Sequence, residues 1–160
     1  MKTLCIIRHA KTEVQAMGQR DFDRELAKRG LSDAPQMAKK LKEIDLMPDK
    51  IVSSPAARAL ATAQLFADKL KYPLTKIEQN SLIYAAALGS LIKVVKELSD
   101  DDKTVFLFGH NPGLTLLANY LCTSPILHLP TSGIVCIDFD TKHWSSITTF
   151  SGKQRFFVHP

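Results

Sequence analysis

The sequence predicts an α/β fold, a three-layer α/β/α sandwich around a mostly parallel central sheet. Two observations lead to this prediction: short apolar runs typical of buried strands occur along the chain, and segments with helical periodicity alternate with them. A composition of 45% hydrophobic and 23% charged residues is that of an ordinary globular protein. The 160 residues contain no linker or internal repeat, so residues 1–160 are interpreted as a single domain.

The strands are predicted from short apolar runs bounded by polar or turn-forming residues. Six segments meet this description: 4–7, 50–52, 75–77, 104–108, 133–139 and 146–150. Runs this short are typical of strands buried on both faces. The link between the last two is too short for a crossover helix, which favours an antiparallel hairpin there.

Four helices are predicted between these strands, over residues 31–44, 56–70, 88–98 and 113–121. In the first, apolar residues recur on one helical face, and Ser32 is the expected N-cap. Pro55 suits the first turn of the second. The polar segment 11–30 has little periodicity and is interpreted as a long loop or lid.

Charge and composition exclude several classes of function. The net charge of +5 comes from scattered residues, which suits anionic ligands and does not indicate a nucleic-acid-binding surface. No apolar stretch is long enough for a membrane span, and no signal peptide is recognised. The three cysteines lie far apart and are interpreted as buried small hydrophobes of a cytoplasmic protein.

Polar residues able to do chemistry follow three of the predicted strands. Arg8 and His9 follow the first, Ser53-Ser54-Pro55 follows the second with Arg58 one helical turn later, and His110-Asn111 follows the strand at 104–108. Because ligands of open α/β sheets bind beyond the carboxyl ends of strands, we expect two arginines and two histidines to converge there.

Such a cluster of cations fits a phosphoryl group, to which each guanidinium can donate two hydrogen bonds. Nearby arginines lower the pKa of a histidine, so that one ring nitrogen stays free to attack phosphorus. The second histidine and the arginines would stabilise charge on the phosphoryl oxygens. No metal or other cofactor is expected, since the chain has neither a clustered acidic set for magnesium nor a histidine pair with zinc spacing.

Several segments of the chain resemble the histidine phosphatase superfamily, whose fold is phosphoglycerate mutase-like, and within it the SixA-type protein phosphohistidine phosphatases. The resemblance spans nearly the whole chain and is carried by LCIIRHAK at 4–11, RELAKRG at 24–30, IVSSPAARA at 51–59, GHNPGL at 109–114 and the shorter IYxA at 83–86 and TSG at 131–133. Two positions differ: Ala10 replaces the glycine of the Arg-His-Gly motif, and Glu25 replaces a proline.

The resemblance implies that His9 is the nucleophile and that Arg8, Arg58 and His110 complete the phosphate pocket. Arg24 is a further substrate-binding candidate from the loop. Asn111 is another, and it is expected to cap or orient the turn at His110. The implied substrate is a phosphohistidine on a signalling phosphotransfer protein.

Two other functions stay open. Larger relatives have a carboxylate before the region of Tyr84 that acts as general acid, whereas this chain reads QNSL at 79–82. An imidazole leaving group needs less protonation than an alcohol, which favours phosphohistidine over a sugar phosphate. A small-molecule phosphomonoesterase would need an acid such as Glu78, Asp21 or Asp23. A non-catalytic phosphate-binding adaptor is motivated only by Ala10. The remaining histidines, His128, His143 and His159, are expected to have no catalytic part.

Overall fold

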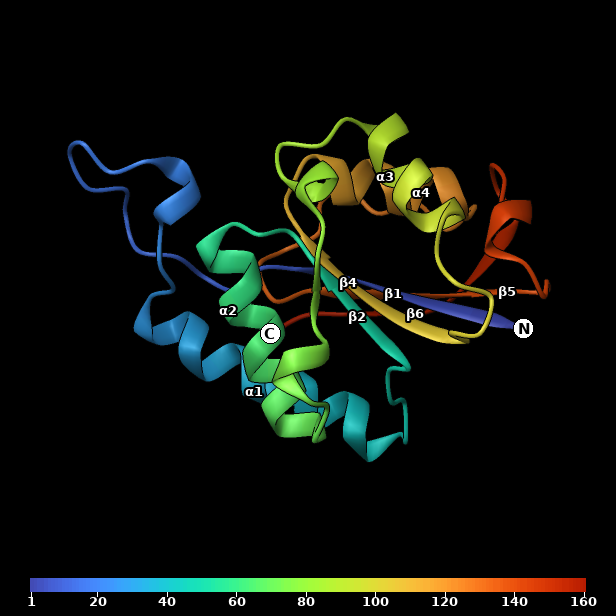
Figure 1. Ribbon diagram of the computed structural model, residues 1–160, viewed down its shortest axis with the longest axis horizontal. Helices are drawn as coiled ribbons and strands as arrows, with labels where there is room; N and C mark the ends of the chain where they lie inside the picture. Colours follow the sequence, from blue (N-terminus) through green and yellow to red (C-terminus); the bar gives the residue numbers. More distant parts are fainter.

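The computed structural model describes residues 1–160 and shows a six-stranded sheet with helices on both faces (Figure 1). The strands lie in the order β3-β2-β4-β1-β5-β6. Their bounds are β1 (Lys2–Arg8), β2 (Lys50–Ser53), β3 (Glu78–Gln79), β4 (Thr104–Gly109), β5 (Ile134–Phe139) and β6 (Gly152–Val158). The predicted three-layer α/β sandwich is confirmed.

The sheet is mixed, with its parallel part at the side where the chemistry is expected. Strands β3, β2, β4 and β1 are parallel, whereas β5 pairs antiparallel with β1 and with β6. In the register of the parallel part, Arg8 lies opposite Gly109 and Ser53 lies opposite Phe108. The carboxyl ends of β1, β2 and β4 therefore meet at one edge, as the strand-end residues predicted.

The helices divide into two pairs, one for each face of the sheet. Helices α1 (Lys28–Glu43) and α2 (Ala57–Leu70) pack together on one face, and α3 (Leu88–Lys96) and α4 (Gly113–Leu121) on the other (Figure 1). Short 3-10 turns complete the chain: η1 (Asp21–Asp23), η2 (Leu74–Lys76), η3 (Ser81–Ile83) and η4 (Trp144–Ser146). None of the helices is both long and apolar enough to cross a membrane.

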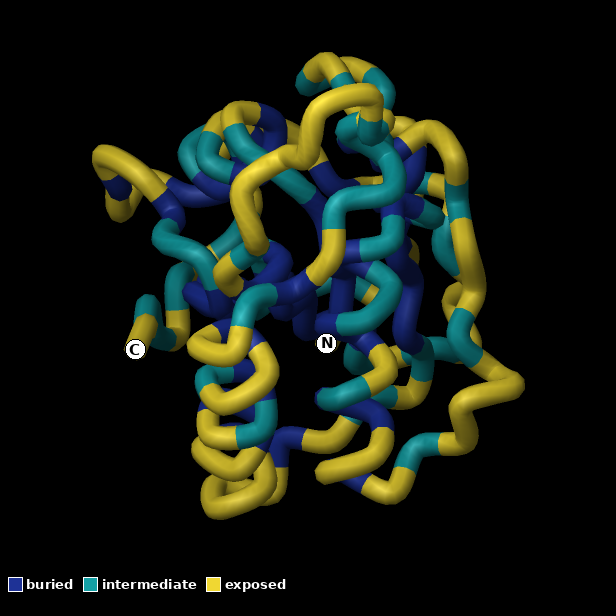
Figure 2. Tube along the Cα trace, turned by 90° about the vertical axis from the view of Figure 1, so that its left-hand side faces the viewer, coloured by how far each residue is buried: buried dark blue, intermediate teal, exposed yellow.

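Two hydrophobic clusters, one on each face of the sheet, form the core. Alternate residues of β1 divide between them: Leu4 and Ile6 face α3 and α4, while Cys5 and Ile7 face α1 and α2. In Figure 2 the buried segments lie at the centre of the molecule, and partly exposed helices surround them. All three cysteines are buried and free, as expected of small core residues. The sheet that carries the strand ends is therefore packed against helices on both of its faces.

Four local predictions are wrong. Pro55 precedes the N-cap residue Ala56 and so lies outside the first turn of α2, which begins at Ala57. Helix α1 begins at Lys28 after Ala27, so Ser32 lies inside the helix and accepts a hydrogen bond from Gln36 instead of capping. Residues 74–76 form the turn η2, and the edge strand β3 follows at 78–79. Residues 146–150 form the end of η4 and a turn, and the last strand is β6. Because β6 lies at the sheet edge, its residues Lys153 and Arg155 are exposed. The segment therefore lacks the apolar run from which the other strands were predicted.

Candidate active site

His9 and His110 come directly after β1 and β4, the two central parallel strands. The His9 backbone N–H donates to the Gly109 carbonyl at 3.1 Å, which continues the strand pairing by one residue. The two imidazole rings lie with their centroids 5.4 Å apart. The register of the sheet therefore brings together two residues that are 101 positions apart in the sequence.

The His9 ring is buried, with 7% of the residue exposed. Its Nδ1 lies 2.8 Å from the carbonyl oxygen of Ala10. A carbonyl only accepts, so Nδ1 carries the proton and the lone pair lies on Nε2. Burial, followed by the charges of Arg8 and Arg58, lowers the pKa of His9 to about 4 against the opposing effect of the Ala10 hydrogen bond. The ring is therefore neutral at pH 7, with Nε2 able to act as a nucleophile.

Ala10 replaces the glycine of the motif that this segment resembles. Its φ is not positive, so the position does not require glycine. The Ala10 N–H donates to Thr62 Oγ1 at 2.9 Å, and the Thr62 hydroxyl donates to the Arg58 carbonyl at 2.7 Å. These bonds connect the end of β1 to the first turns of α2, the helix that carries Arg58.

Three arginines lie around the histidines, one from each of three elements. Arg8 ends β1, Arg58 lies in the first turn of α2, and Arg24 comes from the loop between β1 and α1. Arg58 has only 8% of its side chain exposed, and Arg24 26%. Burial and the charge of Arg58 lower the pKa of Arg8. Packing these cations together is costly unless an anion joins them.

Buried polar side-chain atoms without a hydrogen-bond partner are concentrated at this site. Only six buried side-chain nitrogen or oxygen atoms in the protein have no partner, and four belong to the site: Nε of Arg8, Arg24 and Arg58, and Nδ1 of His110. Buried polar groups normally have partners, so a cluster of unpartnered nitrogens indicates a ligand that accepts hydrogen bonds. The positive charge around them selects an anion.

His110 is held by Ser54, which follows β2. The His110 Nε2 lies 2.8 Å from Ser54 Oγ, and this oxygen already accepts a hydrogen bond from the Ala56 N–H at 3.2 Å. Ser54 Oγ has no other acceptor for its proton, and when it donates to Nε2 the neutral imidazole carries its proton on Nδ1. Burial, then the charges of Arg58 and His9, lower the pKa of His110 to about 3. His110 is neutral at pH 7, and its Nδ1 is buried without a protein partner.

Asn111 has both ends of its amide engaged by the protein. Its Nδ2 donates to the Leu129 carbonyl at 2.8 Å, and its Oδ1 accepts from the hydroxyl of Thr115 at 2.9 Å and from the Thr115 N–H at 3.3 Å. Thr115 lies in the first turn of α4, so Asn111 ties the His110 turn to this helix. Leu129 also accepts from Arg8 at 3.2 Å.

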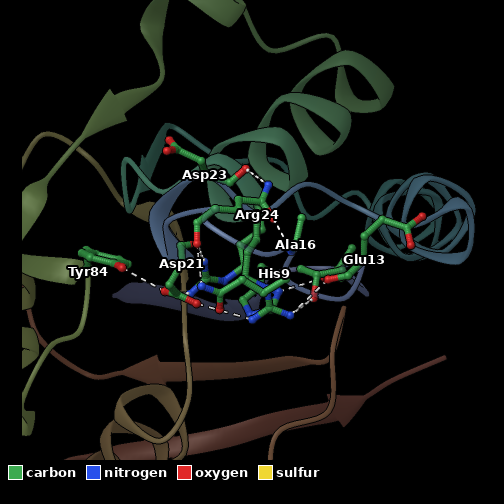
Figure 3. A network of polar contacts seen from close by, with 12 residues as sticks. His9, Glu13, Ala16, Asp21, Asp23, Arg24 and Tyr84 are labelled. Carbon is green, nitrogen blue, oxygen red and sulfur yellow. Dashed lines mark hydrogen bonds and ion pairs between the residues drawn. The ribbon is translucent and has the colours of Figure 1, made fainter.

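Asp21 belongs to the site, although the sequence indicated it only as a candidate acid of the alternative phosphomonoesterase. Its carboxylate accepts hydrogen bonds from Tyr84 Oη and Arg58 Nη2, both at 2.9 Å, and a longer one from Arg24 Nη1 at 3.4 Å (Figure 3). Asp21, Arg58, Tyr84 and His110 line one cleft of about 580 Å³. The only indication in the sequence that Asp21 belongs to the site was its position, three residues before Arg24 in a polar loop.

The other carboxylates considered as acids lie elsewhere. Glu78 pairs with Lys50 at 2.9 Å on the edge strand β3 and is absent from the cleft lining. Asp23 pairs with Arg20 at 2.7 Å in an exposed contact. Of the remaining histidines, His143 pairs with Asp100, and His128 lies 3.3 Å from Arg8 Nη1, a contact that the sequence did not indicate.

Comparison with known proteins agrees with this geometry. A family profile described as histidine phosphatase superfamily, branch 1, matches residues 4–81. The fold is similar to that of SixA from Agrobacterium tumefaciens, a protein proposed to be a phosphohistidine phosphatase, with a TM-score of 0.84, 25% identity, and coverage of 99% of this chain and 98% of that one.

Two further comparisons extend this one. A tungstate complex of the protein histidine phosphatase SixA has the same fold, with a TM-score of 0.85 at 22% identity over 99% of this chain and 97% of that one. Mannitol-1-phosphatase of Eimeria tenella is 30% identical over 118 residues, which is 68% of this chain and 38% of that protein. The chain thus spans well under half the length of this relative.

Proposed function

Because the chain belongs to the histidine phosphatase superfamily, we propose that it is a metal-independent phosphatase that forms a covalent phosphohistidine on His9. The proposed substrate is a phosphohistidine carried by a signalling phosphotransfer protein. The single observation that carries the phosphatase proposal is the cluster of four unpartnered nitrogens beside a neutral, buried His9.

The reaction proceeds in two displacements at phosphorus. In the first, the His9 Nε2 lone pair forms a bond to phosphorus while the bond from phosphorus to the leaving group breaks. In the second, water attacks the phosphorylated His9, inorganic phosphate leaves, and neutral His9 is regenerated. The Nδ1 hydrogen bond to the Ala10 carbonyl stabilises the ring when it becomes cationic on phosphorylation, because this carbonyl lies 2.8 Å away.

The pocket residues bind the phosphoryl oxygens. The Nε–H groups of Arg8, Arg24 and Arg58 and the Nδ1–H of His110 are the donors without a protein partner, and phosphoryl oxygens are acceptors. Charge that develops on the oxygens is stabilised by groups already in place. Asn111, with its amide committed to Leu129 and Thr115, orients the His110 turn and does not bind substrate directly.

Two observations support phosphohistidine as the substrate. First, the likeness to SixA extends over almost the full length of both chains. Second, Asp21, the carboxylate of the cleft, is held by Tyr84 and Arg58, and these bonds outweigh burial and lower its pKa, so it is a poor general acid. A phosphoimidazole protonated on its other nitrogen leaves as neutral imidazole and needs no such acid.

A small-molecule phosphomonoester is the second candidate. The observation in its favour is the 30% identity to mannitol-1-phosphatase, which covers 68% of this chain. The same His9 chemistry serves both substrates, and the difference lies in the protonation of the leaving group. An alcohol leaving group would require a general acid, and Asp21 is the only carboxylate in the cleft lining.

The test is a time course with a phosphotransfer domain phosphorylated on histidine and, in parallel, a small phosphomonoester. Wild type is compared with His9→Ala and with a matched control, His159→Ala, which changes an exposed histidine at the C-terminus. We expect wild type and the control to release phosphate from the domain. Loss of the nucleophile should slow this at least about 1,000-fold.

Each alternative outcome contradicts a different part of the proposal. Turnover of the ester alone, lost in His9→Ala, would keep the mechanism and move the substrate to small molecules. Equal activity of His9→Ala and wild type would refute the covalent mechanism. Absence of any turnover, with phosphate bound by the wild type, would favour the adaptor hypothesis.

A further inference from the structure

We propose that Asp21 is a positioning residue for phosphoryl binding, which holds Arg58 and Arg24 by their terminal nitrogens and leaves their Nε–H groups for the phosphoryl oxygens. The inference rests on the proposed function of the site, since it concerns how the same pocket binds phosphate. It assigns a role to a loop residue that belongs neither to the Arg-His pair nor to the second histidine turn.

The first observation is that Asp21 holds the guanidinium group of Arg58 by its two terminal nitrogens. Its Nη1 donates to the Asp21 backbone carbonyl at 2.7 Å and its Nη2 donates to the Asp21 carboxylate at 2.9 Å. One residue thus engages both terminal nitrogens of a guanidinium with only 8% of its side chain exposed. The remaining nitrogen, Nε, is buried and has no partner.

The same division recurs in Arg24, and Arg8 shows it for one terminal nitrogen. Arg24 donates from Nη2 to Thr12 Oγ1 at 2.7 Å and from Nη1 to Asp21 at 3.4 Å, and Arg8 donates from Nη1 to the Leu129 carbonyl at 3.2 Å. In each of the three, Nε alone is buried without a partner. The terminal nitrogens of Arg58 and Arg24 are therefore anchored, whereas Arg8 is held through Nη1 only, and Asp21 anchors two guanidinium groups at once.

Tyr84 fixes Asp21 itself. Its hydroxyl donates to the same carboxylate oxygen, Oδ2, that accepts from Arg58, and its ring packs edge-on against Phe22 with centroids 5.2 Å apart. Phe22 lies between Asp21 and Asp23 in the turn η1. The loop residue is thus held from the far side of the cleft, and Figure 3 shows Tyr84 pointing across to Asp21.

Electrostatics and positioning predict opposite effects for the loss of Asp21. A carboxylate beside the pocket repels an incoming phosphate, so removing its charge alone should tighten phosphate binding. If Asp21 instead fixes the arginines, removing its carboxylate leaves Arg58 held only by the backbone carbonyl of residue 21, and Arg24 only by Thr12 and Glu13. The added freedom of the two side chains then costs affinity. The sign of the change in phosphate affinity therefore separates the two roles.

The chain offers a matched control in Asp23. It lies in the same turn η1, it carries the same charge, and its side chain is 47% exposed against 44% for Asp21. Its carboxylate pairs with Arg20, outside the cleft. The variants Asp21→Ala and Asp23→Ala thus remove the same charge from the same turn, and only the first removes the carboxylate that contacts Arg58 and Arg24. Both keep the backbone carbonyl of residue 21 that accepts from Arg58 Nη1.

The experiment titrates inorganic phosphate into wild type, Asp21→Ala and Asp23→Ala by calorimetry, with melting temperatures to verify folding. We expect phosphate to bind at least about tenfold more weakly to Asp21→Ala, as for the loss of a hydrogen bond to a charged group. Asp23→Ala should stay within about twofold of wild type. Tyr84→Phe, which changes no charge, should weaken binding by about threefold.

The alternative outcomes are distinct. Tighter binding to Asp21→Ala would overturn the proposal and make Asp21 a competing anion. Unchanged binding, with a loss of kcat confined to a substrate with an alcohol leaving group, would overturn it in favour of a general acid. A wild-type protein that binds no phosphate and turns over no substrate would overturn the proposed function itself.

Discussion

His9 and His110 lie with their ring centroids 5.4 Å apart because β1 and β4 are parallel neighbours in a register that places Arg8 opposite Gly109. Each histidine is the first residue after its strand. Since each ring is buried near the other and near Arg58, a proton on either one is disfavoured. The pair is thus kept neutral by the same geometry that, in the proposed mechanism, lets both rings contact one phosphoryl group.

The first prediction concerns these two protonation states. In an NMR titration of the imidazole nitrogens, His9 should titrate near pH 4 and His110 near pH 3, because burial and the arginines disfavour the charged rings. Addition of phosphate should raise both pKa values, since the anion offsets the arginine charges. A His9 ring that titrates at its ordinary value of 6.5 in the free protein would contradict this account of the nucleophile.

The second prediction is a loss of stability in mild acid. The unfolded chain takes up a proton on each histidine near pH 6.5, whereas the folded site resists it down to about pH 4 for His9 and about pH 3 for His110. More protons are bound when unfolded, so stability falls as the pH drops through this window. For His9 the loss is at most about 3 kcal/mol.

Melting temperatures in phosphate-free buffers between pH 7 and 4.5 measure this effect. The variant His110→Gln should lose less stability over that range than wild type, because it has only one of the two histidines whose pKa is lowered in the folded protein. The range stays above the region in which the carboxylates of Asp21 and Asp138, both with lowered pKa, add to the loss. If the melting temperatures of wild type and His110→Gln fell equally with pH, His110 would be excluded as a source of the acid-induced loss of stability.

The parallel core of the fold could be predicted because its strands are buried on both faces. Ile6 and Leu107 have no exposed surface, and the runs in which they lie are apolar without alternation. The candidate cluster followed from the same logic, since Arg8, His9 and His110 stand at the ends of such runs. Edge strands lack this signal, and β6, with exposed Lys153 and Arg155, was placed wrongly for that reason.

The anchoring contacts could not be predicted, because they depend on the path of a loop. Asp21 meets Tyr84 across 63 residues, and no spacing rule joins a polar loop to the segment after a 3-10 turn. Likewise, the contact of His128 with Arg8 depends on how the segment after α4 returns to β5. Sequence patterns indicate which residues end strands, whereas loop geometry decides which side chains hold them.

A third prediction concerns Asn111. Replacement by Ala removes the acceptor of the Thr115 hydroxyl and the donor to the Leu129 carbonyl, which should cost about 1–3 kcal/mol of stability. The turn that carries His110 would also loosen, so phosphate affinity should fall with it. Urea unfolding and a phosphate titration measure the two effects. Full stability with weakened phosphate binding would instead indicate direct binding by the Asn111 amide.

The last prediction concerns the point where the loop that carries Asp21 leaves β1. Gly30, in the first turn of α1, packs directly on the Lys11 backbone, and an added Cβ would lie 2.2 Å from the Lys11 carbonyl oxygen. A backbone atom cannot rotate away as a side chain does, so Gly30→Ala must displace the loop or the helix. We expect a loss of about 2–4 kcal/mol in urea unfolding, comparable to other severe packing changes, and weaker phosphate binding because the loop carries Asp21 and Arg24.

Gly89→Ala is the matched control, because the same change is made in a helix where no atom lies within 4 Å of the added Cβ. Alanine is the better helix former, so this variant should gain about 0.4–1 kcal/mol. The two substitutions therefore have opposite signs although their chemistry is identical. A Gly30→Ala variant as stable as wild type, with equal phosphate affinity, would contradict this prediction. The close contact between α1 and Lys11 would then not determine the position of the loop that carries Asp21.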